Sequence, residues 1–391
     1  MRAACADPAT LPLDYPLRHE QLLPELGARG GTSDDRLACE LRSLGATQQC
    51  SLDRVLMPVV KEYGFGATVH ALLKPILFAL KQEPPLTPLT PQLLLYTDGG
   101  RCATRDLSCY FSPLAKCEAV PIALPNGSAL PKSALVATQV SANGVPHVAP
   151  ALPGARHVRD FTWSEVTRNG RRSLPSRHRA KGLFWVIAQL LAFVMRPGAE
   201  LEALLARQRR KLRWPATAPV LGLHVRRGDA CSAGELQRTR RDCTALADYM
   251  PAVRALTERY AIKHVYLATD DDATLRETRR YPEVRWLFLH GGGAARTARL
   301  RAKTRVEFLI QGGKLSGYDE AMNAALDMAL LARADAFVGK FTSNMDRAVY
   351  ALMSALRGGC LPPYVSLDSA WCFDFGVASG YNSRLNLTFK C

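Results

Sequence analysis

The chain has 391 residues, which is long enough to bury two separate hydrophobic cores. Apolar residues make up 48% and charged residues 22%, a globular balance that excludes a wholly disordered protein. Lys and Arg outnumber Asp and Glu by 51 to 35, so the net charge is +16. No finger, RRM or helix-turn-helix signature accompanies this charge. Anionic ligands or acidic glycans therefore explain it as well as nucleic acid does, and unspecific surface charge explains it best.

The first half of the chain predicts a leader followed by an N-terminal domain. Residues 1–32 are rich in Pro, Gly and Ala without periodicity, and we expect a poorly ordered leader. An N-terminal α/β domain is expected over 33–213. Within it, Gly64 and Gly66 open a predicted helix, where backbone N–H groups could meet a phosphate or ribose, although a plain tight turn is the simpler alternative. The Pro/Ala/Val-rich stretch 121–154 predicts a long surface insertion.

Two helices are predicted before the second domain begins. Leu183–Met195 is apolar almost all round, which is typical of a buried helix, and it is too short to span a bilayer. A second helix, 199–212, is amphipathic with a basic outer face. Pro215 and Pro219 then mark the boundary of a C-terminal domain, expected over 214–391.

Strands and helices alternate in this C-terminal domain. Strands are expected at 220–226, 264–269, 285–290 and 336–340, and helices at 319–334, at 347–356 and from Tyr249. Such alternation predicts a parallel, doubly wound, Rossmann-type sheet.

Charged and polar side chains follow three of these strands. His224, Arg226, Arg227 and Asp229 end the first, Asp270 and Asp271 the second, and Thr342–Asn344 the fourth. Ligands of open α/β sheets bind at the carboxyl ends of strands. Two adjacent arginines suit a diphosphate, because each guanidinium offers a planar fork to phosphate oxygens. Arginines in water at a strand end are the alternative, but the convergence on one edge favours a ligand site.

Several stretches together resemble the core α1,6-fucosyltransferase family and its bacterial nodulation relatives. They are HVRRGD (224–229), HVYLATDD (264–271), LDMALLARADAFVGKFTSNMDR (326–347), the FW…VMRP run (184–197) and GFG…H (64–70). The resemblance covers roughly 39–357. It implies a GT-B-like fold of two domains and inverting transfer of fucose from GDP-fucose to a glycan hydroxyl, of α1,6 type, with no metal and no other cofactor.

The resemblance also implies roles for individual residues. His224 and Asp327 match positions that recognise guanine, and Arg226, Arg227 and Ser343 match positions around the diphosphate. The acidic pair Asp270 and Asp271 matches one that the family needs, and the donor site is completed by Asn344, Gly64, Gly66 and His70. A carboxylate can accept both N1–H and N2–H of guanine, which adenine cannot offer. Without the resemblance, Asp327 would be interpreted as a solvated acid.

The acceptor side departs from the family pattern. Ala230 stands where the family has a lysine, and the loop from Asp229 to Asp248 is several residues longer. Glu235 is only an approximate counterpart of the glutamate that would assist the acceptor hydroxyl; we include Asp229 and Glu235 with the two arginines as catalytic candidates. We expect no counterpart of the family's N-terminal stalk or its C-terminal SH3-like domain within these 391 residues. A non-catalytic GDP-sugar-binding module is therefore the alternative, and a nucleic-acid-binding protein a weaker one.

Eleven cysteines and two sequons, at Asn126 and Asn386, favour a secretory compartment, expected to be the Golgi lumen. Met1–Thr10 has no hydrophobic signal region, so a luminal fragment or a truncated gene model is expected. No cysteine pair has CxxC spacing, which disfavours a zinc site. Disulfides are predicted for Cys231–Cys243 and Cys360–Cys372 and, through the resemblance, for Cys39–Cys117. The alternative is reduced, buried cysteines in a cytosolic protein.

Overall fold

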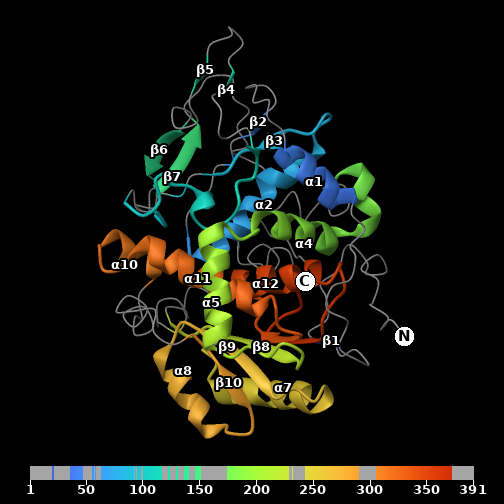
Figure 1. Ribbon diagram of the computed structural model, residues 1–391, viewed down its shortest axis with the longest axis vertical. Helices are drawn as coiled ribbons and strands as arrows, with labels where there is room; N and C mark the ends of the chain where they lie inside the picture. The colour runs from blue at the N-terminus through green and yellow to red at the C-terminus, as the bar shows by residue number, and fades with distance from the viewer. Residues whose placement is uncertain are drawn as a thin grey trace, which may run out of the picture.

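A computed structural model shows how the chain is arranged (Figure 1). It describes residues 20–21, 36–46, 55–56, 58, 63–91, 93, 95–97, 100–116, 122–123, 129–130, 136–140, 146–150, 174–228, 231, 243–289 and 305–371. Among these, no helix is both long and apolar enough to cross a membrane.

The C-terminal half is built on a six-stranded sheet. Its strands are β1 (Glu20–Gln21), β8 (Val220–Val225), β9 (His264–Thr269), β10 (Arg285–Leu287), β11 (Ala336–Gly339) and β12 (Tyr364–Ser366). They lie in the order β1-β12-β11-β8-β9-β10, and only β1 is antiparallel to its neighbour. From β8 onward, the chain order across the sheet is 3-2-1-4-5, the doubly wound arrangement of Rossmann folds. The predicted α/β class and Rossmann-type parallel sheet are therefore confirmed.

The two faces of the sheet belong to two apolar clusters. Because side chains alternate along a strand, Leu221, Leu223 and Val225 of β8 point to one face, where α7 (Leu246–Arg259) covers them. On the opposite face, Tyr266 and Ala268 join a larger cluster. The helices α11 (Gly317–Leu331) and α12 (Asn344–Ala355) cover that face.

The N-terminal half supplies helices to the same large cluster. They are α1 (Arg36–Ala46), α2 (Phe65–Lys81), α4 (Leu183–Val194) and α5 (Ala199–Lys211). The helix α4 is apolar on nearly every side, as predicted, and ten of its residues are buried. It packs on α12, so the halves on either side of Pro215 share one core.

The remaining elements are short. They are β2 (Val55–Leu56), β3 (Thr87–Pro88), β4 (Ile122–Ala123), β5 (Ala129–Leu130), β6 (Val136–Val140), β7 (Pro146–Pro150), α8 (Asp272–Glu277), α10 (Val306–Gln311) and the 3-10 turns η2 (Leu107–Cys109), η6 (Ser176–Lys181) and η8 (Thr278–Arg280). The strands of the predicted insertion 121–154 form two antiparallel pairs, β4–β5 and β6–β7, at the end of the molecule opposite α7 (Figure 1). Two residues of the predicted leader, Glu20–Gln21, form β1 on the edge of the large sheet.

Candidate active site

The candidate residues gather where the strand order reverses. The sheet continues from β8 to β9 and β10 on one side and to β11 and β12 on the other, so the topological switch point lies between the carboxyl ends of β8 and β11. Ligands of doubly wound sheets bind at such a point. Arg226 leaves the sheet directly after β8, and Lys340 directly after β11. The predicted phosphate-binding arginine and a lysine that the sequence did not single out therefore lie at the same switch point.

Asp270 fixes the turn that carries the arginines. Its Oδ1 accepts the backbone N–H groups of Arg227 (2.7 Å) and Gly228 (2.8 Å). A side chain at Gly228 would put its Cβ 2.8 Å from the Asp270 carboxylate, so this approach requires a glycine. One carboxylate thus joins the end of β9 to the end of β8.

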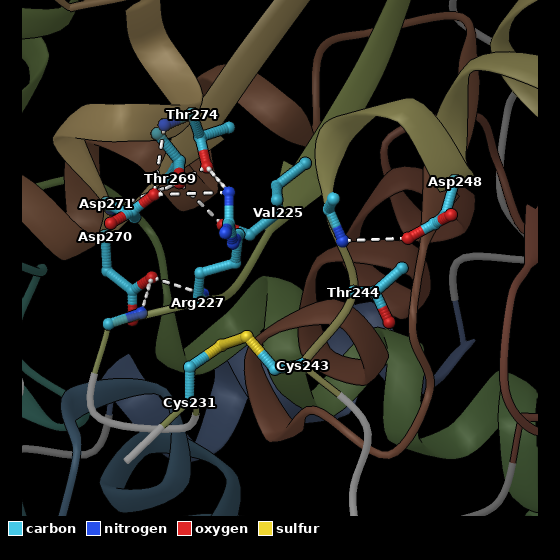
Figure 2. Close-up of a disulfide and its surroundings, with 12 residues drawn as sticks. Val225, Arg227, Cys231, Cys243, Thr244, Asp248, Thr269, Asp270, Asp271 and Thr274 are labelled. Carbon is cyan, nitrogen blue, oxygen red and sulfur yellow. Dashed lines mark hydrogen bonds and ion pairs between the residues drawn. A yellow bond between two sulfur atoms is a disulfide. The ribbon is translucent and has the colours of Figure 1, made fainter. Parts of the chain in front are cut away.

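Arg227 points toward Asp271 and Thr274 at the start of α8 (Figure 2), and it also reaches Glu277 at the end of this short helix. Its Nη1 lies 3.0 Å from Oε1 of Glu277 and 3.6 Å from Oδ2 of Asp271. Asp271 is buried and caps α8, accepting from the backbone N–H (3.0 Å) and hydroxyl (2.9 Å) of Thr274. Asp270, Asp271 and Arg227 therefore form one network that orders the β8 and β9 ends.

The predicted disulfide Cys231–Cys243 is confirmed, with its Cα atoms 5.0 Å apart (Figure 2). The Cys231 N–H donates to the carbonyl of Arg227 over 3.1 Å, so the bridge is attached to the arginine turn. Cys243 immediately precedes Thr244, whose hydroxyl accepts from Nζ of Lys340. The disulfide thus connects the β8 exit to the β11 exit.

Other cysteines add one bridge that was not predicted. Cys102 and Cys109 are joined, with Cα atoms 5.7 Å apart. Cys360 is in a disulfide. Its expected partner Cys372 lies outside the described residues, so the bridge Cys360–Cys372 stays a prediction. Cys39 is not disulfide-bonded, so the predicted bridge Cys39–Cys117 is wrong.

His224 is buried at the end of β8 beside the carboxylate of Asp346. Its Nδ1 is hydrogen-bonded to Oδ1 of Asp346, and the two side chains are 6% and 1% exposed. Desolvation alone would lower the pKa of His224, but the charge and hydrogen bond of Asp346, helped by Asp270, outweigh it and raise that pKa. This site therefore favours an imidazolium.

The first turn of α12 lies at the switch point and is held in place from several sides. Ser343 is its N-cap, with its hydroxyl 3.4 Å from the Asp346 N–H, and the Asn344 amide oxygen accepts from Nη2 of Arg347 over 2.5 Å. Thr342 directly precedes this N-cap, and its hydroxyl donates a hydrogen bond to the carboxylate of Asp368, which follows β12. Hydrogen bonds thus hold the helix start, with the predicted Ser343 and Asn344, at the switch point.

The Gly64-Phe65-Gly66 loop reaches the same edge. Gly64 is the N-cap of α2 without any side-chain cap, and a Cβ at Gly66 would lie 3.1 Å from Cβ of Met345 in α12. The first turns of α2 and α12 are therefore in contact. His70 is buried one turn further along α2. The structure thus brings the predicted loop next to the first turn of α12 at the switch point.

Asp327 is buried. Its sequence context alone suggested a solvated acid, and that interpretation is wrong. Asp327 is 7% exposed, and its Oδ1 accepts from the Tyr266 hydroxyl over 2.6 Å. Tyr266 lies on β9 and shares the sheet face with His224. Asp327 and His224, assigned together from the resemblance, therefore face the same layer between the sheet and α11.

Part of the predicted acceptor side cannot be placed. Asp229, Ala230 and Glu235 lie outside the described residues. In the described part of the chain, no group of three or more His, Cys, Asp or Glu side chains could hold a metal ion.

The sequence reasoning missed Asp346, Lys340 and Asp368. Ser343 and Asp346 do have the spacing of a capping box, which indicates a helix start. That signal gives a backbone role and does not reveal the contact with His224, which is 122 positions away.

Residues 32–371 match the family of α-(1,6)-fucosyltransferase N- and catalytic domains. An α-(1,6)-fucosyltransferase of Drosophila melanogaster is 26% identical over 217 residues, which are 53% of this chain; the chain thus spans about a third, 31%, of that relative. The solved structure of NodZ α-1,6-fucosyltransferase soaked with GDP-fucose is similar over 76% of this chain and 92% of its own, with a TM-score of 0.39 and 14% identity. POFUT1 in complex with GDP-fucose is similar over 50% and 52%, with a TM-score of 0.30 and 12% identity.

Proposed function

Because the chain belongs to the α-(1,6)-fucosyltransferase family, we propose that it transfers fucose from GDP-fucose to a glycan hydroxyl with inversion at the anomeric carbon. The observation that carries the proposal is the set of family-matched residues at the switch point. His224 and Arg226 come from the end of β8 and Ser343 from the segment after β11, 117 positions further along the chain, yet these strand ends are adjacent in the sheet.

The chemistry asks for charge where the leaving group forms. As the bond from the anomeric carbon to the β-phosphate oxygen breaks, negative charge grows on GDP, and the sugar develops oxocarbenium character. A fixed guanidinium stabilises that charge most in the transition state. We assign this task to Arg226. Arg227, engaged with Glu277 and Asp271, holds the turn and α8 in place while its charge remains nearby.

The nucleobase is assigned to the layer between the sheet and α11. Asp327 would accept from guanine N1–H and N2–H, and its hydrogen bond from Tyr266 already orients the carboxylate. The start of α2 at Gly64 and Gly66 would cover the sugar or phosphates with backbone N–H groups. Asp229 and Glu235 remain the candidates for assisting the acceptor hydroxyl.

We further propose that the protein works in an oxidising, secretory compartment such as the Golgi lumen. The disulfides Cys231–Cys243 and Cys102–Cys109 support this proposal, because bridges persist where thiols are not kept reduced. The partners would be a GDP-sugar and a glycan or glycoprotein acceptor.

A panel of GDP-sugars assayed against mixed glycan acceptors tests the function. We expect fucose to be transferred from GDP-fucose, and GDP-mannose to give no transfer. Tight binding of GDP-fucose without transfer or hydrolysis would instead favour a non-catalytic binding module. Strongly salt-dependent binding of oligonucleotides, without GDP-sugar binding, would favour the nucleic-acid alternative.

A further inference from the structure

The carboxylate of Asp346 has both oxygens committed at the switch point. Oδ1 is hydrogen-bonded to Nδ1 of His224, and Oδ2 accepts the backbone N–H of Lys340 over 2.6 Å. A Cβ at Gly339 would lie 2.5 Å from Oδ2, so the residue before Lys340 must lack a side chain. With 1% of its side chain exposed, Asp346 cannot turn away from His224.

This arrangement determines which ring nitrogen of His224 is left for a ligand. Nδ1 faces Asp346, and within the described part of the chain Nε2 makes no hydrogen bond. If the ring is neutral, the proton is on Nδ1 and Nε2 is an acceptor; if the ring is an imidazolium, Nε2–H is a donor. Asp346 therefore controls the hydrogen-bonding character of the nitrogen that remains.

The charged groups around the ring favour the donor. Asp346 reaches it from α12, Asp270 adds negative charge from the end of β9, and Arg226 on the same strand opposes them. From α7, Tyr249 is buried close to Asp346 and Asp270. Desolvation raises the pKa of its hydroxyl, and the charges of the two carboxylates raise it further, so the hydroxyl stays neutral. On the α11 side, Asp327 is engaged by Tyr266.

A donor at Nε2 distinguishes the purines. Guanine presents the acceptors N7 and O6 on its outer edge, whereas adenine presents N7 and the N6 amino donor. An imidazolium donor can pair with O6 and meets only another donor at N6. We propose that Asp346 is a specificity-determining positioning residue, which holds His224 as a hydrogen-bond donor that accepts guanine and rejects adenine. This inference rests on the proposed use of a GDP-sugar.

The test is the binding of GDP and ADP to wild type and Asp346→Asn, measured by calorimetry at pH 7.5 and pH 5.5. The amide removes the negative charge that favours the protonated ring, and its single oxygen can accept from only one of Nδ1–H and the Lys340 N–H. We expect GDP to bind on the order of 10- to 100-fold more weakly than to wild type, the loss of a charge-assisted hydrogen bond, while the affinity for ADP stays nearly unchanged. At pH 5.5 the ratio of variant to wild-type Kd for GDP should shrink; taking the ratio cancels the titration of the phosphates themselves.

A matched control is Asp335→Asn. Asp335 is also a buried carboxylate, and it accepts the backbone N–H of Val220 in β8 over 2.8 Å. It lies at the amino ends of β8 and β11, whereas Asp346 lies at their carboxyl ends. The Asp335→Asn variant should change neither the GDP-to-ADP preference nor the pH dependence. A second test places Asp346→Asn in a His224→Gln background, where it should cost no further GDP affinity, since contacting residues that act as one unit are not additive.

The outcomes separate the two proposals. Equal losses for GDP and ADP without recovery at pH 5.5, or a full second loss in the His224→Gln background, would give Asp346 a merely structural role and overturn the inference. Wild type binding GDP, with Asp346→Asn unchanged, would also overturn it and leave the proposed function intact. A wild type that binds no GDP would overturn both.

Discussion

The carboxylate of Asp270, at the end of β9, accepts the backbone N–H of Arg227, at the end of β8, over 2.7 Å. The same oxygen holds Gly228, so a single side chain from the neighbouring strand fixes the turn that positions Arg226. The run Asp270–Asp272 looks like a metal-binding signature in sequence. In the structure, Asp270 binds the turn after β8, Asp271 caps α8, and Asp272 forms an exposed ion pair with Arg276.

Replacing Asp270 by Ala should therefore cost both stability and turnover. Two backbone donors lose a charged acceptor, and each such hydrogen bond contributes about 1.5–3 kcal/mol. We expect a loss of that order in the free energy of unfolding, measured with denaturant, and a lower kcat for fucose transfer. Asp272→Ala is the control, because its exposed i,i+4 pair should contribute about 0.5 kcal/mol or less. Equal effects of the two variants would contradict the role given to Asp270.

Removing the Cys231–Cys243 bridge with the double substitution Cys231→Ser, Cys243→Ser should lower the free energy of unfolding by roughly 3 kcal/mol. It should also weaken GDP-fucose binding. The Cys231 N–H is hydrogen-bonded to the Arg227 carbonyl, and Cys243 directly precedes Thr244, whose hydroxyl accepts from Lys340. Removing Cys102–Cys109 instead should destabilise the fold without changing donor affinity. The assignment would be wrong if both double variants bound GDP-fucose as wild type does.

Transfer should need no divalent cation. The carboxylates of Asp270 and Asp271 are occupied by backbone and Thr274 donors, while Arg226 supplies positive charge at the proposed diphosphate. We expect the initial rate of transfer to be the same after dialysis against EDTA as before it. Loss of activity with EDTA and its rescue by Mn²⁺ would show that the acidic run binds a metal.

A pH-dependent contribution to stability is expected from Glu40 in α1. Burial alone would raise the pKa of Glu40, but hydrogen bonds from His178 and Arg177 outweigh it and lower the pKa from 4.5 to about 2. A depressed folded-state pKa stabilises the fold at neutral pH, and this contribution is lost as the pH falls from about 4.5 towards 2. The stability difference between wild type and Glu40→Gln should thus be largest at pH 7 and shrink below pH 4.5. A difference that is constant down to pH 3 would rule out this ionisation as its origin.

Local patterns predicted the sheet well because its strands are continuous apolar runs. β8, β9 and β11 were expected within one residue of where they lie, and α4 was recognised from its uniform hydrophobicity. The short β12 and α8 were not predicted, since three to six residues carry little periodic signal. The ends of β8 and β11 are neighbours only because of the order of the strands in the sheet, and no local sequence pattern contains that order.

The partners of the site residues were harder to predict than the residues themselves. His224 with Asp346, and Asp327 with Tyr266, are separated by 122 and 61 positions, and only folding brings them together. With eleven cysteines the pairings were similarly open: the spacing of Cys231 and Cys243 indicated a bridge, whereas that of Cys102 and Cys109 was overlooked.

The most direct test of the account compares fucose transfer from labelled GDP-fucose to mixed glycans by wild type, Arg226→Ala and Arg226→Lys. If Arg226 stabilises the charge on departing GDP, Arg226→Ala should lower kcat on the order of 10²–10³-fold, and lysine should not restore it, because one ammonium cannot reproduce a planar fork. The matched control is Arg254→Ala. Arg254 lies on α7 and forms an exposed ion pair with Glu283, so its variant should transfer fucose as wild type does. Near wild-type transfer by Arg226→Ala would contradict the assignment of the diphosphate to the switch point between β8 and β11.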